Sequence, residues 1–316
     1  MPLVSGSDIL LEARRGGYAV GAFNFNNLEF LQAITGAAEA EQTPVFLATS
    51  EGAVAYAGLD FIIAMVRAAA ARTAIPLALH LDHGRNLDLI QSCIKAGYTS
   101  VMIDASHLPF EENLHITKQV VQMAHPAGVS VEAELGRLKG VEDIVAVAER
   151  DAVLVDPAQA QQFVRETGVD SLAPAIGTVH GAFKFKGEPK LDFDRLKRVN
   201  ELTGIPLVLH GASSVPEELR RAAEEFGVKI AGARGVPLED IQQAIHAGVC
   251  KVNVDTDLRL AMLASIRQTL TEHPEEIDPR KILGPARDAI AKLVQERIRA
   301  FKIGVGCQVP GVEDWV

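Results

Sequence analysis

Three of the nine histidines in the chain stand just after separate apolar, strand-like segments: His83, His180 and His210. Imidazole nitrogen is a preferred ligand of Zn²⁺, and three neutral imidazoles leave a fourth coordination position open for a substrate oxygen. If the three segments end at a common face, the pattern predicts a catalytic zinc site. His80 lies inside its apolar segment, and we interpret it as a hydrogen-bonded core residue.

Acidic residues stand at the ends of three neighbouring segments: Asp82, Asp104 and Glu134. Grouped carboxylates repel one another unless a cation is present, so their grouping also favours a metal. Asp82 adjoins His83 and could reach a substrate held on that metal. Asp104 and Glu134 could bind a metal directly or could orient the histidine ligands instead. The pattern leaves both roles open.

Eight short apolar segments could form the strands that bring these side chains together. Near-continuous apolar strands that alternate with helices are typical of a parallel sheet covered on both faces. Eight such units predict a closed (β/α)8 TIM barrel. A doubly wound open sheet is the alternative, but it normally has fewer strands, and no GxGxxG sequence follows the first segment. The segments cover residues 19–23, 45–48, 77–81, 101–103, 129–133, 171–173, 207–209 and 249–254.

Small and polar residues gather after the same segments. In a (β/α)8 barrel the strand ends converge on one face, and the loops after strands seven and eight often bind phosphate. The glycines of GTVHG, at 177–181, also allow a ligand to approach the backbone closely. The residues predicted to contact a substrate or its phosphates are Asn24, Ser50, Gly181, Gly211, Ala212, Ser213, Asn253, Val254, Asp255 and Thr256.

The last part of the chain predicts long helices beyond those that one barrel unit needs. They span about 258–305, and Pro274 and Pro279 interrupt them. We expect one barrel domain over residues 1–316, with these C-terminal helices used in oligomerisation. The segment 136–143, with two glycines and several charges, is predicted to be a loop.

Composition excludes several classes of protein. The chain has 316 residues and a formal net charge of −10, which disfavours non-specific binding to nucleic acid. The first residues lack the apolar core of a signal peptide, and Arg67, Arg72 and Pro76 interrupt the most apolar stretch, so we expect no membrane span. Three cysteines stand far apart, which is typical of a protein of the reducing cytoplasm.

Long motifs in the chain closely resemble those of class II fructose-1,6-bisphosphate aldolases, the family that includes tagatose-bisphosphate aldolases. The resemblance runs from the first strand to the last helix. It implies a zinc-dependent, reversible retro-aldol cleavage of fructose 1,6-bisphosphate to dihydroxyacetone phosphate and glyceraldehyde 3-phosphate, as in glycolysis. The motifs are AFNFNNLEF, HLDHG, SVMIDASHLPFEEN, VEAELG, GTVHGAFK, LVLHGASSVP, KVNVDTDLR and DPRKILGPAR.

The resemblance also implies roles for individual residues. His83, His180 and His210 would hold the zinc, and Asp104 and Glu134 would serve a second divalent position. Asp82 would move the proton on the aldehyde-derived oxygen, and Glu142 would handle the proton on the dihydroxyacetone phosphate carbon. Gly181, Gly211 to Ser213 and Asn253 to Thr256 would bind the dihydroxyacetone phosphate end, assisted by a monovalent cation such as Na⁺ or K⁺.

The resemblance further implies a homo-oligomer, either a dimer or a tetramer, in which Arg280 binds the distal phosphate in a neighbouring subunit. Tagatose 1,6-bisphosphate is the alternative substrate, because it differs at one stereocentre only. A Schiff-base aldolase is disfavoured, since Lys251 starts its strand and Lys184 lies in a loop. A zinc hydrolase and a metal-binding barrel with a structural role are the remaining alternatives.

Overall fold

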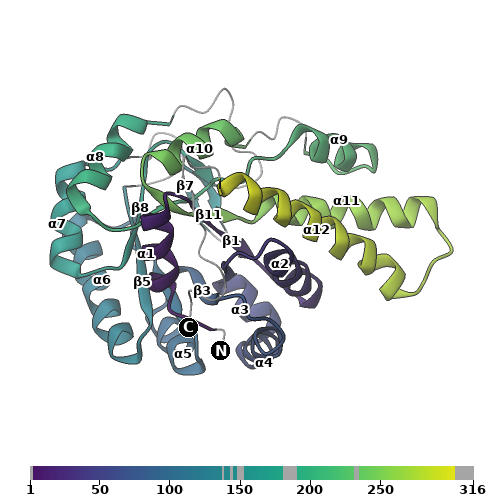
Figure 1. Cartoon of the computed structure of the whole chain (residues 1–316), viewed down its shortest axis with the longest axis horizontal. Helices are drawn as coiled ribbons and strands as arrows, with labels where there is room; N and C mark the ends of the chain where they lie inside the picture. Colours follow the sequence, from purple (N-terminus) through teal and green to yellow (C-terminus); the bar gives the residue numbers. More distant parts are fainter. Residues whose placement is uncertain are drawn as a thin grey trace.

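The fold is described from a computed structural model over residues 3–136, 139–142, 145–147, 153–180, 191–230 and 235–302 (Figure 1). For 139–142, 145–147 and 179–180 the description covers the backbone only.

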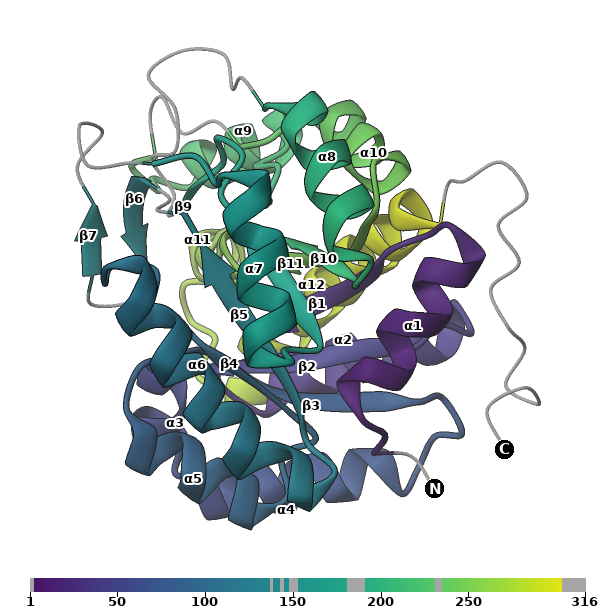
Figure 2. The same ribbon diagram turned by 90° about the vertical axis from the view of Figure 1, so that its left-hand side faces the viewer.

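Eight parallel strands close into a barrel, which confirms the predicted (β/α)8 fold (Figure 2). β1 pairs with β2 on one side and with β11 on the other, where Val20 lies opposite Lys251. Almost every strand residue is buried, because helices cover the outside and side chains fill the inside. The strands are β1 (Val20–Asn24), β2 (Val45–Ser50), β3 (Leu77–Gly84), β4 (Ser100–Ile103), β5 (Ser130–Leu135), β8 (Ser171–Pro174), β10 (Leu207–Leu209) and β11 (Val249–Val254).

Helices follow the strands and pack around the barrel (Figures 1 and 2). Short polar side chains begin several of them: Asn27, Ser50, Asn86, Asp156 and Asp192 each accept a hydrogen bond from a backbone N–H of the first turn. The helices are α2 (Leu28–Ala40), α3 (Glu51–Ala57), α4 (Leu59–Ala70), α5 (Leu87–Ala96), α6 (Phe110–Ala124), α7 (Pro157–Thr167), α8 (Phe193–Thr203), α9 (Glu217–Glu225) and α10 (Leu238–His246), with a short 3-10 helix (His125–Ala127) after α6.

One helix before the barrel and one small sheet outside it are not predicted by the sequence pattern. Helix α1 (Gly6–Gly16) precedes the barrel, and its Ile9, Leu10 and Ala13 pack in a core cluster with residues of the strand beginnings. A small sheet of β6 (Lys139–Glu142), β7 (Val145–Val147) and β9 (Val179–His180) lies outside the barrel. It places a strand in the segment expected to be a loop.

Two long helices project from the barrel as an arm (Figure 1). They are α11 (Thr256–Glu272) and α12 (Pro279–Phe301), close to the predicted C-terminal helices. α12 also packs on α2, and Arg299 near its end forms an ion pair of 2.7 Å with Glu41.

Across the described residues, no single helix is both long and apolar enough to cross a membrane; α3 and α4, which meet at a 93° bend, reach that length and composition only as a pair.

Candidate metal centre

Two of the predicted zinc ligands face each other inside the barrel. His83 Nε2 lies 2.8 Å from His210 Nδ1, and both side chains are buried. His83 lies within β3 rather than after it, as does Asp82, which corrects the expected strand boundary. His83 has a φ of +50°, which is uncommon for a residue with a side chain, and the pairing of β3 with β4 shifts between Leu81 and Gly84. The strand is therefore irregular at the point where Asp82 and His83, although adjacent in sequence, both reach the same site.

On each ring the second nitrogen, which faces away from the other histidine and is called the outer nitrogen, points to a carboxylate. His83 Nδ1 is 3.4 Å from Asp104 Oδ2, and His210 Nε2 is 2.7 Å from Glu132 Oε1. An ionised carboxylate only accepts hydrogen bonds, so the outer nitrogens must donate. The two inner nitrogens then direct lone pairs toward each other, and this arrangement needs either a proton shared between them or a metal cation bound by both lone pairs. This donor set fits a divalent metal such as zinc.

Two more carboxylates border the same point. Asp82 Oδ1 is 3.9 Å from His83 Nε2, and Glu134 Oε2 is 3.6 Å from His210 Nδ1. Ligand atoms of Asp82, His83 and His210 lie within 4.8 Å of one another, and so do those of His83, Asp104 and Glu134. The described residues therefore offer two overlapping sets of metal ligands that share His83.

The Asp82 carboxylate is held by two asparagine amides from neighbouring parts of the barrel. Asn24 Nδ2 donates to Asp82 Oδ2 over 2.9 Å, and Asn253 Nδ2 donates to Asp82 Oδ1 over 3.0 Å. The Oδ1 atoms of both asparagines are buried without a hydrogen-bond partner among the described residues. Since a buried acceptor without a partner is costly, both atoms are suited to accept hydrogen bonds from a bound ligand.

Asp104 is fixed from several sides. It accepts hydrogen bonds from Arg85 Nε (2.9 Å), from Arg85 Nη2 and from Ser106 Oγ (2.7 Å). Burial alone would raise the pKa of Asp104, but the hydrogen bond and charge of His83, the charge of Arg85 and the Ser106 hydroxyl hold that pKa well below its usual value. Asp104 is thus ionised and oriented toward His83. Arg85 directly follows HLDHG, yet nothing in its spacing indicated this role.

The loop after β10 is held by a buried aspartate that no sequence motif indicates. Asp257, near the start of α11, accepts hydrogen bonds from the backbone N–H groups of Ser214 (3.1 Å) and Val215 (2.9 Å). Arg297 of α12 donates to the same carboxylate over 3.2 Å. Ser213 Oγ accepts from the Asp255 N–H over 3.3 Å, so the loops after β10 and β11 are joined.

The remaining predicted site residues lie in different surroundings. Ser50 begins α3 and lines a hollow of about 490 Å³ that also contacts Tyr56 and Leu263. Arg280 is exposed at the start of α12, where it pairs with Asp278 over 2.7 Å. His180 and Glu142 are placed by their backbone only, in β9 and β6, and their side chains lie outside the described residues, as does all of Gly181.

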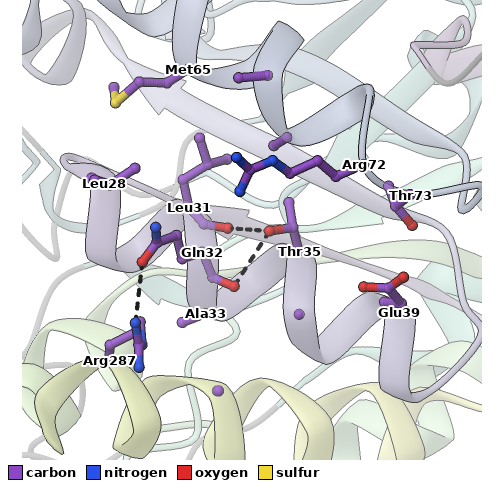
Figure 3. Close-up of a pocket in the computed structure, with 14 residues that line it drawn as sticks. Leu28, Leu31, Gln32, Ala33, Thr35, Glu39, Met65, Arg72, Thr73 and Arg287 are labelled. Carbon is purple, nitrogen blue, oxygen red and sulfur yellow. Dashed lines mark hydrogen bonds between the residues drawn. The ribbon is translucent and has the colours of Figure 1, made fainter. Parts of the chain in front are cut away.

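A hollow of about 600 Å³ on the outside of the barrel lies between α2, α4 and α12 (Figure 3). Leu31 and Thr35 line it from α2, Met65 from α4 and Arg287 from α12. Among the described residues, none of the predicted site residues lines it. The polar strand ends, with their buried histidines and acids, are therefore the better candidate site.

Comparisons with known proteins agree with one another. The sequence profile described as "Fructose-bisphosphate aldolase class-II" matches residues 4–304. A fructose-bisphosphate aldolase of Helicobacter pylori is 55% identical over 298 residues, covering 94% of this chain and 97% of that protein. One of Thermus caldophilus is 52% identical over 299 residues, covering 95% and 98%. Among solved structures, the YdjI aldolase from Escherichia coli K12 is 31% identical with a TM-score of 0.78, covering 97% of this chain and 100% of that one.

Proposed function

This chain belongs to the class II fructose-bisphosphate aldolase family, and we propose that it cleaves fructose 1,6-bisphosphate reversibly into dihydroxyacetone phosphate and glyceraldehyde 3-phosphate with the help of Zn²⁺. Family membership makes the protein an aldolase, a lyase that acts on a sugar phosphate. The observation that carries the proposal is the pair His83 and His210, whose inner nitrogens meet beside the Asp82 carboxylate.

Asp82 is the proposed acid–base residue. A bound divalent cation would supply Lewis-acid polarisation of the ketone and would favour negative charge on its oxygen. Asp82 would accept the C4 hydroxyl proton as the C3–C4 bond breaks, and in condensation it would return that proton. The amides of Asn24 and Asn253 restrict the carboxylate to one orientation, and their Oδ1 atoms would accept hydrogen bonds from substrate hydroxyls.

The metal-ligand set would be His83, His180 and His210. Asp104 lies beside the outer nitrogen of His83, which supports an orienting role, whereas its grouping with Glu134 and His83 supports a second divalent position. Glu142 would handle the proton on the dihydroxyacetone phosphate carbon.

The loops after β10 and β11 are proposed to bind the dihydroxyacetone phosphate end. The hydrogen bond between Ser213 and the Asp255 N–H joins the first loop to the N-terminus of α11, and a helix N-terminus favours anions. Gly211, Ala212 and Ser213 would contribute from the first loop and Asn253 to Thr256 from the second, with Gly181, Ser50 and a monovalent cation such as Na⁺ or K⁺ assisting.

A Schiff-base mechanism is disfavoured by the surroundings of Lys251. Its ammonium is fully buried and donates to Glu132 over 2.5 Å and to His80 over 3.1 Å. A lysine engaged in this way is not an available nucleophile, because it would have to lose a proton and both partners before attacking a ketone.

A coupled cleavage assay on fructose and tagatose 1,6-bisphosphates, with and without EDTA, tests the proposal. We expect turnover of the fructose ester, its loss in EDTA, its return with Zn²⁺, and no inactivation by borohydride in the presence of substrate. Preference for the tagatose ester would establish the alternative substrate. Failure on both sugars in Zn²⁺-loaded protein would refute the proposed reaction.

We also propose that the C-terminal arm mediates a homodimer or homotetramer in which Arg280 binds the distal phosphate of a neighbouring subunit. The exposure of Arg280 on a projecting arm supports this. Subunits carrying Arg280→Ala and subunits carrying Asp82→Ala should each be weakly active alone. If Arg280 acts in trans, their hybrids regain one competent site, whereas unchanged activity on mixing and reassembly would contradict the arrangement.

A further inference from the structure

A chain of buried polar contacts crosses the barrel beneath the candidate metal centre. Lys251 Nζ on β11 donates to Glu132 Oε2 on β5 over 2.5 Å, and Glu132 Oε1 lies 2.7 Å from His210 Nε2. On its other side, Lys251 Nζ is 3.1 Å from His80 Nε2 on β3, and His80 Nδ1 is 2.8 Å from Ser100 Oγ on β4. None of these five side chains is more than slightly exposed.

Lys251 is held in one position by three neighbours. Glu132 and His80 accept its hydrogen bonds, and the ring of Phe46 lies 5.2 Å from Nζ, within the range of a cation–π contact. Phe46 in turn meets His80 edge-on, with ring centroids 5.8 Å apart. A buried ammonium with this many partners has little freedom to move, so the Glu132 carboxylate that it binds is also fixed.

Each hydrogen bond in the chain fixes which atom carries the proton. Lysine donates only, so His80 Nε2 must accept and His80 Nδ1 must donate to Ser100. Glu132 accepts from Lys251 through one oxygen and from His210 Nε2 through the other. His210 therefore carries its proton on Nε2, and the Nδ1 lone pair is left to face His83 and the metal position.

We propose that Lys251, acting through Glu132, is a positioning residue for His210, and that it selects the ring nitrogen through which His210 binds the metal. Lys251 does not touch the substrate or the metal. Its part is to hold Glu132 at the orientation in which the carboxylate accepts from His210 Nε2. This inference rests on the proposed function only in treating His210 as a metal ligand.

The alternative is that Lys251 serves only to neutralise the buried charge of Glu132. Lys251→Met alone leaves the Glu132 carboxylate buried without its cation, so that variant is expected to fold poorly. The double variant Lys251→Met/Glu132→Gln removes both charges together and restores neutrality. If charge balance were the whole role, this double variant would regain the metal affinity of the unmodified protein along with its stability.

The test measures Zn²⁺ affinity by competition with a chelator, together with the visible absorption of the Co²⁺-loaded protein. We expect the double variant to bind Zn²⁺ about 10- to 100-fold more weakly, as happens when an orienting partner of a metal ligand is removed, and to show altered Co²⁺ bands. The control is Tyr98→Phe, which deletes a buried hydrogen bond of 2.8 Å to Thr49 away from this chain and should change neither readout. Unchanged affinity and bands in the double variant would overturn the proposal.

A second measurement needs no substitution and covers the case in which the double variant does not fold. Imidazole ¹⁵N–¹H spectra of the Zn²⁺-loaded protein should show the His210 proton on Nε2, in slow exchange with water. A His210 ring that binds metal through Nε2 and is protonated on Nδ1 would refute the assignment. Neither the metal-binding measurements nor the imidazole spectra depend on sugar cleavage. A protein that gives the expected metal-binding and spectral results but cleaves no sugar would therefore count against the proposed reaction alone.

Discussion

Asn253 on β11 donates from Nδ2 to Oδ1 of Asp82 on β3 over 3.0 Å, although β1 and β2 separate the two strands in the barrel. The contact is possible because both side chains point into the barrel interior, where distant strands face each other. The same Oδ1 atom lies 3.9 Å from Nε2 of His83.

Replacing Asp82 by alanine should abolish most turnover while metal remains bound. A positioned acid–base residue typically contributes about 10²- to 10⁴-fold in rate, so kcat should fall by that factor. Steady-state kinetics with elemental analysis of bound zinc provide the measurement, and Asp194→Ala on the exposed side of α8 is the control. A near-normal kcat in Asp82→Ala would remove Asp82 from the mechanism.

Replacing Asn253 by alanine should weaken catalysis through the orientation of Asp82. Hydrogen bonds to a charged group contribute about 1.5–3 kcal/mol, which corresponds to roughly 10- to 100-fold in kcat if the bond matters only when the proton moves. Asn24→Ala should act in the same direction. The kcat of the double variant should be lower than that of either single variant. If steady-state kinetics gave the double variant the kcat of the unmodified enzyme, Asp82 would not depend on the two asparagines.

The stability of the fold should fall as the solution is acidified, partly through His80. Burial and the neighbouring charge of Lys251 lower the pKa of His80 from 6.5 to about 3. Between these values the unfolded chain binds a proton that folded His80 does not, so the free energy of unfolding decreases as pH falls through this window. The slope from this group is about 1.4 kcal/mol per pH unit.

The variant His80→Gln isolates this contribution. Chemical unfolding at pH 6.5 and at pH 5 should show the unmodified protein losing about 2 kcal/mol more than the variant over that interval. Burial alone would raise the pKa of Glu132, but the charge of Lys251 and the His210 hydrogen bond hold it well below its usual value. Glu132 therefore adds acid sensitivity only at lower pH, and parallel profiles for the two proteins would contradict the assignment to His80.

Replacing Asp257 by asparagine should weaken phosphate binding more than chemistry. The carboxylate accepts two backbone N–H bonds from the loop after β10 and is fully buried, so an amide NH₂ group would face one of those donors. We expect KM for the sugar bisphosphate to rise roughly 10-fold, with thermal stability also reduced. Asp288→Asn on the surface of α12 is the control, and an unchanged KM would show that the loop does not depend on Asp257.

The pattern of apolar segments was sufficient to predict the barrel and its eight strands, because strand spacing and burial are local properties. It was insufficient for α1, for the small sheet outside the barrel, and for the end of β3, which continues through Asp82 and His83. The sequence predicts a strand that ends at Leu81, because polar residues typically begin a loop, whereas in the folded chain Asp82 and His83 point into a polar interior.

The candidate site likewise contains residues that the sequence predicts and residues that only the folded chain reveals. Residue type and position after a strand identified His83, His210 and Asp82 as neighbours, since all strands of a parallel barrel end at one face. Glu132 and Asp257 were missed, and Lys251 was considered only as a Schiff-base nucleophile, because each looks like an isolated charge along the chain. Their partners are tens to more than a hundred residues away, so only closure of the barrel, which sets strands from distant parts of the sequence against one another, determines which nitrogen, oxygen and ammonium groups meet.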